Sequence, residues 1–254
     1  MSLLAVERLS KSFGGVHAVA DVTFSLEAGE MLAIIGPNGA GKSTCFNMIN
    51  GQLRPDGGRV LLDGRDIVGL APHAIWRMGV GRTFQVAATF SSMNVLENVQ
   101  LAALSHRREL TRFWRPVARY PAGQALDLLA QVGMADQAKR PCSDLAYGDV
   151  KRVELAIALA NDPKLLLMDE PTAGMAPGER IAMMTLTRNL ARQRSMGVLF
   201  TEHSMDAVFG FSDRLLVLAR GKLIAQGTPQ EVRNDPAARS AYFGSERAFE
   251  GVKP

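Results

Sequence analysis

The chain has 254 residues, of which 47% are hydrophobic, and its formal net charge is +4 at pH 7. This length and apolar content allow a buried core and exclude a largely disordered chain, and so mild a positive charge does not imply a nucleic-acid partner. Two cysteines, Cys45 and Cys142, are too few for a disulfide framework and fit a reducing compartment. No apolar run approaches the roughly 20 residues of a membrane helix, and the first residues lack a signal-peptide pattern, so we expect another chain to supply any membrane part.

The first third of the chain has the pattern of short strands. Apolar residues alternate at Val22, Phe24 and Leu26 and again over residues 59–62, between glycine-rich turn signals. These segments predict partly antiparallel strands on either side of the apolar run 31–35, which has the form of a buried strand.

A glycine-rich loop follows that run directly and matches the P-loop pattern G-x-x-x-x-G-K-[ST] at every fixed position. Glycines let backbone N–H groups surround a phosphate, and a helix beginning near Lys42 adds the positive end of its dipole. Lys42 is expected to reach the β- and γ-phosphates and Ser43 to reach Mg²⁺. The alternative, a chance glycine-rich turn, is disfavoured by the strand before and the helix after. The candidate nucleotide-binding residues here are Gly36, Pro37, Asn38, Gly39, Ala40, Gly41, Lys42, Ser43 and Thr44.

The rest of the chain predicts a helical insert followed by a parallel sheet. From about Asn94 to Ala160, apolar residues recur at helical spacing. Short apolar runs then return at 165–168, 198–200 and 215–218, separated by helical stretches at about 178–194 and 204–211. This alternation is typical of a parallel sheet covered by helices, and the polar residues 244–254 are expected to form a loosely held tail.

Two carboxylates follow the apolar run 165–168. A P-loop ATPase needs a carboxylate at the end of a neighbouring buried strand to hold Mg²⁺, and Asp169 is placed for that role. Glu170 follows it and is the candidate general base for the attacking water. The alternative is that both residues only cap the segment that begins at Pro171.

Together these motifs resemble the ABC transporter ATPases. The sequence DLAYGDVKRVELA over residues 144–156 is similar to the signature loop and helix of that family, which separates it from other P-loop proteins. The resemblance extends from about residue 4 to 243. It implies an α/β fold, with a P-loop, RecA-like ATPase core, an N-terminal antiparallel β subdomain and a helical insert. The implied boundaries are about 4–87 and 161–243 for the core with the β subdomain, and about 88–160 for the helical subdomain.

The resemblance also assigns roles to three single residues. Gln85 matches the glutamine that ligates Mg²⁺ and orients water, His203 matches the histidine that contacts the γ-phosphate and the general base, and Phe13 matches the aromatic that stacks on adenine. Taken singly, a glutamine or histidine at a strand end is usually an ordinary polar residue, and one aromatic near glycines is often packing. Their joint occurrence in family order favours the functional interpretation.

In the family, the signature loop contacts ATP held by a second subunit, which implies a homodimer or heterodimer of ATPases. The loop here, Leu145, Ala146, Tyr147, Gly148 and Asp149, departs from the commonest form LSGGQ. Ala146 lacks the serine hydroxyl that usually reaches the γ-phosphate, and Lys151 and Arg152 are candidates to compensate for the charge of Asp149. For the signature loop we expect a weakened contact with phosphate and not a lost function, because the Gly148 N–H and the start of the following helix remain to bind it. Ala176 stands where the family often has an aspartate in the loop that couples the two sites, so the resemblance supports hydrolysis better than communication across the dimer.

Within the family, the segments FGGVHA, LAYGD and AGMAPGE resemble the ATPases of branched-chain amino-acid importers. This implies ATP and Mg²⁺ as cofactors, a second ATPase subunit and transmembrane permeases as partners, and indirectly a solute-binding protein. It also implies a peripheral position on the cytoplasmic face of the inner membrane and no nucleic-acid partner. Open alternatives are ATPases of urea or amide uptake and of lipopolysaccharide export. From other classes, the alternatives are a soluble ABC protein of DNA repair or translation and a small-molecule kinase, which would leave the signature loop and His203 without a purpose.

Overall fold

The computed structural model describes residues 2–83, 89–107, 117 and 120–243. Their strands form two sheets, in the orders β2-β1-β4-β5 and β10-β9-β3-β8-β7-β6. The smaller sheet is antiparallel, and the larger one is parallel except for β10 at its edge. The smaller sheet consists of β1 (Leu4–Phe13), β2 (Val16–Leu26), β4 (Gly57–Leu62) and β5 (Arg65–Asp66). The larger consists of β3 (Met31–Ile35), β6 (Val80–Thr83), β7 (Leu165–Asp169), β8 (Gly197–Thr201), β9 (Arg214–Ala219) and β10 (Lys222–Gly227).

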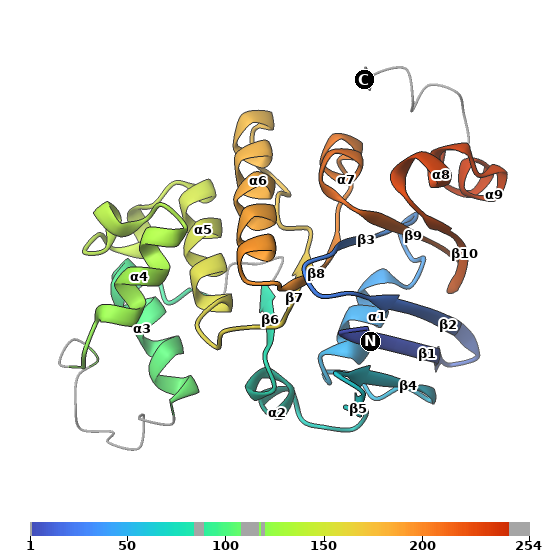
Figure 1. The fold of residues 1–254 in the computed structure, drawn as a ribbon, viewed down its shortest axis with the longest axis horizontal. Coiled ribbons are helices and arrows are strands. Elements are labelled where there is room, and N and C mark those ends of the chain that lie inside the picture. The colour runs from blue at the N-terminus through green and yellow to red at the C-terminus, as the bar shows by residue number, and fades with distance from the viewer. Residues whose placement is uncertain (1, 84–88, 108–116, 118–119, 244–254) are drawn as a thin grey trace.

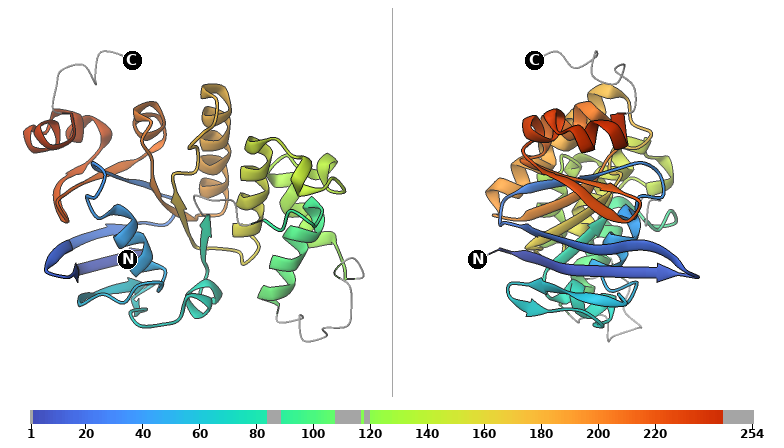
Figure 2. Two further views of the ribbon diagram at one scale, coloured as in Figure 1. Left: turned by 180° about the vertical axis from the view of Figure 1, so that it is seen from behind. Right: turned by 90° about the vertical axis from the view of Figure 1, so that its right-hand side faces the viewer.

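The central parallel strands β3, β7, β8 and β9 are largely apolar because both faces of the larger sheet are covered. Along β3, Leu32 and Ile34 join a core shared with the smaller sheet and α1 (Lys42–Ile49), whereas Ala33 and Ile35 join a second core on the opposite face. Helix α1 lies between the two sheets, and α6 (Pro177–Gln193) and α7 (Met205–Phe211) cover the other side (Figures 1 and 2).

A group of helices stands beside the strand β6 (Figure 1). Its first long helix begins at a capping box, in which the Asn94 side chain accepts from the Glu97 backbone N–H at 2.8 Å while the Glu97 carboxylate accepts from the Asn94 N–H at 3.0 Å. This group confirms the helical insert expected from the sequence. It comprises α3 (Val95–His106), α4 (Gly123–Gln131) and α5 (Tyr147–Ala158), with short 3₁₀ turns at Ala135–Gln137 and Cys142–Asp144.

Several elements were not predicted from the sequence. Strand β10 doubles back on β9, and a C-terminal group of helices packs against it. A signal for its first helix was available, because Thr228 and Glu231 form a capping box that opens α8. The unpredicted helices are α2 (Pro72–Arg77), α8 (Pro229–Asn234), α9 (Pro236–Ala238) and a π-helical turn at Arg239–Phe243.

The fold class expected from the sequence is confirmed: a mixed α/β core, an antiparallel β subdomain and a helical insert. Strands β3, β7 and β8 run in the same direction, so their C-terminal ends lie at one edge of the sheet. The P-loop and the two segments that begin at Asp169 and Glu202 therefore emerge together, where open α/β sheets bind their ligands.

Candidate functional site

The P-loop leaves β3 at Gly36 and enters α1 at Lys42. Two of its glycines are required by space as well as by backbone angle. A Cβ at Gly36, where φ is +155°, would lie 2.2 Å from the Leu218 carbonyl oxygen, and one at Gly41, where φ is +104°, would lie 2.3 Å from the Ala18 carbonyl oxygen. The loop is therefore a tight backbone cradle held against β9 and β2, which suits the close approach of a phosphate.

Lys42 lies inside this cradle and is only 8% exposed. Its Nζ donates to the carbonyl oxygens of Gly36 at 2.7 Å and Pro37 at 3.1 Å. Burial lowers the pKa of Lys42, while the carboxylates of Glu170 and Asp169 act to raise that pKa. The Lys42 ammonium therefore lies within electrostatic reach of both carboxylates at the end of β7.

Asp169 and Glu170 are oriented by the neighbouring strand β8. Asp169 is in register with Thr201, whose Oγ1 donates to Asp169 Oδ1 at 2.7 Å. The backbone N–H of Glu170 faces the Oγ1 and the carbonyl oxygen of Thr201, at 3.0 and 3.2 Å. Glu170 has a φ of +50°, in the left-handed region that residues other than glycine seldom adopt, so the chain turns sharply away from the sheet at this carboxylate.

His203 reaches Glu170 across this turn. The distance from His203 Nε2 to Glu170 Oε1 is 2.9 Å, and both side chains are partly exposed, at 48% for His203 and 21% for Glu170. An ionised carboxylate only accepts hydrogen bonds, so His203 donates through Nε2. The pair is thus held together while remaining open to a ligand.

Three further residues of the site were not identified from the sequence. Thr201 orients the Asp169 carboxylate and holds the backbone of Glu170. Arg82 joins Asp169 to the P-loop helix, because its Nη2 lies 3.9 Å from Asp169 Oδ2 and its Nη1 donates to Asn47 Oδ1 at 3.0 Å. Glu202 is buried beside His203. The sequence signal for these residues was a polar side chain at the end of a strand. That signal points to this site only when the strand is known to lie next to β7 in the sheet.

Phe13 is half exposed at the end of β1, and Lys11 Nζ lies 5.7 Å from the centre of its ring. The hairpin that carries Phe13 touches the P-loop where Ala18 meets Gly41. An exposed ring on this hairpin is suited to stacking on an adenine base. Gln85, by contrast, lies outside the described residues.

The signature residues 145–149 lead into α5, which begins at Tyr147 with Ala146 at the N-cap position and no side-chain cap. Tyr147 is 46% exposed, and a Cβ at Gly148 would lie 3.2 Å from Glu179 Oε1. In Figure 1, α5 and α1 lie on opposite sides of β6, so this loop and the P-loop of the same chain are separate.

The expected compensation of Asp149 by its basic neighbours is not what the structure shows. Lys151 is 2% exposed, pairs with Glu154 at 2.8 Å and lies over the ring of Tyr147, with Nζ 5.6 Å from the ring centre. Arg152 donates to the Val132 carbonyl oxygen at 3.4 Å. Lys151 is two positions after Asp149 and so faces away from it on the helix. Arg152 is three positions after Asp149, on the same side of the helix, but its guanidinium is directed to the Val132 carbonyl oxygen of the helical insert.

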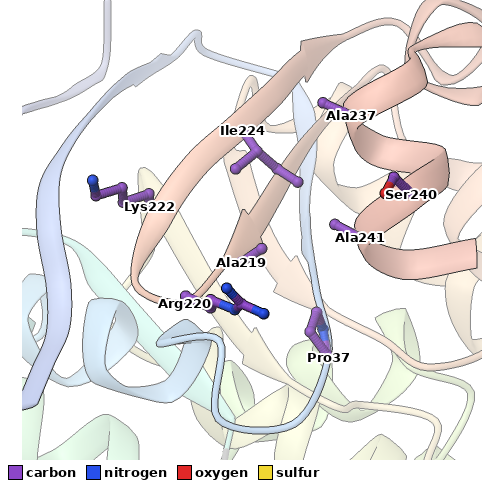
Figure 3. Close-up of a pocket in the computed structure, with 8 residues that line it drawn as sticks. All are labelled: Pro37, Ala219, Arg220, Lys222, Ile224, Ala237, Ser240 and Ala241. Atoms are coloured by element: carbon purple, nitrogen blue, oxygen red, sulfur yellow. The ribbon is translucent and has the colours of Figure 1, made fainter. Parts of the chain in front are cut away.

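A pocket of about 740 Å³ lies beside the P-loop, between the β9–β10 hairpin and the C-terminal helices (Figure 3). Pro37 forms one wall, and Gly221 at the turn of the hairpin donates to the Ala40 carbonyl oxygen at 3.1 Å. The C-terminal segment is therefore in contact with the nucleotide loop, which the sequence did not indicate. The lining residues are Pro37, Ala219, Arg220, Lys222, Ile224, Ala237, Ser240 and Ala241.

Comparison with known proteins agrees with this geometry. Residues 19–173 match the ABC transporter family, and residues 222–248 match the family described as branched-chain amino acid ATP-binding cassette transporter. Two solved structures, a nucleotide-free ATP-binding cassette and the ADP conformation of a cassette, both from ABC transporters, each superpose with a TM-score of 0.86, at 32% and 31% identity, over 96% of this chain and all of theirs. The chain belongs to the ABC transporter ATP-binding family and is an ATP-hydrolysing transporter subunit.

Within that family, it is similar to two proteins of branched-chain amino acid transport. It is 40% identical to the high-affinity branched-chain amino acid transport ATP-binding protein LivG of Salmonella typhimurium and 39% identical to LivG of Escherichia coli, in both cases over 95% of this chain and 98% of the relative. It is also 35% identical to the lipopolysaccharide export system ATP-binding protein LptB of Haemophilus influenzae, over 97% of this chain and 99% of that one. No helix among the described residues is long and apolar enough to cross a membrane.

Proposed function

We propose that the chain hydrolyses ATP at the edge where β3, β7 and β8 end, with Glu170 as the general base. The observation that carries this proposal is the Glu170–His203 pair at 2.9 Å, within electrostatic reach of Lys42. Glu170 takes a proton from the attacking water, and His203 keeps the carboxylate aimed at the γ-phosphate. The P-loop backbone and Lys42 hold the phosphates.

The oxygen ligands present fit Mg²⁺. Ser43 stands at the start of α1, and the Asp169 carboxylate is held by Thr201 at the end of the adjacent β7. No group of three or more His, Cys, Asp or Glu side chains that could hold a metal occurs among the described residues, which fits an ion bound mainly through substrate phosphates with one or two protein oxygens. Ser43 and Asp169 are the proposed protein ligands, with Gln85 as a third; the ion supplies charge neutralisation on the phosphates.

Removal of the metal is expected to stop turnover reversibly. With EDTA in excess over Mg²⁺, release of phosphate should fall to background, because the charge on the phosphates is then not neutralised. Addition of Mg²⁺ in excess over EDTA should restore the rate. Undiminished phosphate release in EDTA would contradict the proposed role of the ion.

We propose that two such subunits form one functional unit. The signature loop of a chain is separated from its own P-loop, and Tyr147 and the start of α5 are exposed. A second ATPase subunit, identical or not, would present this helix N-terminus to the nucleotide held by the first. The Gly148 N–H and the dipole of α5 then replace the hydroxyl that Ala146 lacks.

We propose uptake of branched-chain amino acids as the transport step, through permeases with which the chain assembles at the membrane. The similarity to LivG and the match of residues 222–248 support this solute over lipopolysaccharide, which the lower identity to LptB keeps as the second candidate. The groove that we propose for the permease has a volume of about 420 Å³. It lies between the proposed core, residues 4–87 and 161–243, and the proposed helical subdomain, residues 88–160. The Trp76, Ala102 and Ile157 side chains line it.

This assignment predicts that the tagged chain, purified from detergent-solubilised membranes of its own cells, retains membrane-spanning subunits. Ala102→Arg is expected to abolish their recovery, because the long charged side chain fills the groove and places a second cation beside Arg82. Ala130→Arg, on an exposed surface of α4, is the matched control and should retain them. Proteoliposomes of the complex, supplied with its solute-binding protein, should take up leucine when ATP is provided. Recovery with ribosomes or DNA, or with lipopolysaccharide-export components, would contradict the assignment.

A further inference from the structure

We propose that Glu202 is a positioning residue for hydrolysis, because its carboxylate ties the segment after the general base to the segment that carries His203. The inference rests on the proposed roles of Glu170 and His203 and adds a residue that neither touches phosphate nor belongs to the recognised motifs. Glu202 follows β8 directly and is only 4% exposed.

Both oxygens of this carboxylate are engaged. Glu202 Oε1 accepts from the backbone N–H of Thr172 at 2.8 Å and from its hydroxyl at 2.5 Å. Glu202 Oε2 accepts from the backbone N–H of His203 at 3.2 Å. One buried carboxylate therefore joins the residue two positions after Glu170 to the backbone of the histidine that contacts Glu170.

The geometry at Glu170 explains why such a tie is needed. Glu170 adopts a φ of +50°, a conformation that persists only where the surrounding structure holds it. Thr201 holds the turn on the side of the sheet through the Glu170 N–H, and Glu202 holds it on the far side through Thr172, which is 1% exposed. With both sides fixed, the 2.9 Å contact between His203 and Glu170 needs no further ordering at the moment of reaction.

A second contact, nearer the surface than that of Glu202, joins the segment after Glu170 to the segment that carries His203. Arg180 in α6 donates to Ser204 Oγ at 2.6 Å and to the Met175 carbonyl oxygen at 3.4 Å. Ser204 immediately follows His203, and Met175 lies in the segment after Thr172. The Glu202 contact is the inner and more buried of the two, so we expect it to dominate the geometry of the catalytic pair.

A glutamine at position 202 has the same shape but only one accepting oxygen. Whichever way its amide is turned, the NH₂ group faces a backbone N–H, either that of Thr172 or that of His203. One buried donor then loses its partner, and the two segments are no longer held in one arrangement.

The test is steady-state ATP hydrolysis by the full chain with Mg²⁺, at one fixed protein concentration. Glu202→Gln is expected to lower kcat by about ten- to a hundredfold while KM for ATP stays within about twofold, because phosphate binding belongs to the P-loop. Thr172→Val, which removes only the hydroxyl donor, is expected to lower kcat by about three- to tenfold. Thr172→Ser restores the hydroxyl and is expected to restore kcat.

Glu30→Gln is the matched control. Glu30 is also a largely buried, two-sided carboxylate, which accepts from the Glu27 N–H at 2.7 Å and from Arg214 at 3.0 Å, but it lies just before β3 begins, at the opposite end of the sheet. Its replacement is expected to lower the melting temperature without changing kcat.

Parental kcat in both Glu202→Gln and Thr172→Val overturns the inference, as does an equal loss of kcat in Thr172→Ser and Thr172→Val. If Glu202→Gln does not fold, the comparison of kcat between Thr172→Val and Thr172→Ser tests the inference by itself. Glu170→Gln is measured in parallel. If this variant retains turnover, the proposed function itself fails. If it loses turnover while Glu202→Gln and Thr172→Val keep the parental kcat, only the role of Glu202 is removed.

Discussion

Glu170→Gln is expected to lower kcat for ATP hydrolysis by about 10²- to 10⁴-fold, the contribution of a positioned general base. The amide keeps the size of the side chain and can still accept from His203 Nε2, which lies 2.9 Å from Oε1 in the parent. It cannot take a proton from water, so the loss falls on the chemical step. Phosphate release under saturating Mg²⁺ and ATP measures it, and the stalled variant should accumulate as an ATP-bound dimer on gel filtration.

The control for this variant is Glu7→Gln, at an exposed carboxylate on β1 that pairs with Arg59 at 2.7 Å. Such exposed pairs contribute little, and we expect hydrolysis and stability close to those of the parent. Turnover by Glu170→Gln within about twofold of the Glu7→Gln control would remove Glu170 as the base and point to another proton acceptor.

Lys42→Ala is expected to weaken ATP binding by about ten- to a hundredfold, which corresponds to the loss of charge-assisted hydrogen bonds to phosphate. Burial lowers the pKa of Lys42, and the nearby carboxylates of Glu170 and Asp169 counteract this. A bound phosphate adds negative charge beside the ammonium and so favours its charged form further. Calorimetric titration with ATP and Mg²⁺ in the Glu170→Gln background measures affinity without turnover.

Lys164→Ala is the matched control, because it also removes one lysine but at a site away from the P-loop. Lys164 pairs with Asp63 at 2.7 Å on the surface, with its side chain 60% exposed. We expect this variant to bind ATP as the parent does. Equal ATP affinity in the Lys42 and Lys164 variants would contradict the phosphate assignment of the P-loop.

The elements that are encoded in consecutive residues were predictable. The P-loop combines an apolar strand, glycines and a lysine within one short segment, and the helical insert is visible as three- and four-residue spacing. The strands that end at Asp169 and Thr201 were predicted from their apolar runs, and the structure confirms both. Strand β10 was not predicted, because it is only partly buried and carries no strong alternation. Helix α8 was missed although the residues of its capping box, Thr228 and Glu231, have the spacing of a helix start in the sequence.

The chain by itself determined which chemistry is possible, because a phosphate cradle, a metal-binding carboxylate and a general base are local patterns of residue types. Tertiary structure decided which side chains hold them in place. Thr201, Arg82 and Glu202 act across strands or between separate segments, and Lys151, expected to offset Asp149, is instead buried with Glu154. Contacts between residues about thirty positions apart, such as Thr172 and Glu202, depend on which strands are neighbours. Strand order is a property of the packed sheet, and no local pattern of residues encodes it.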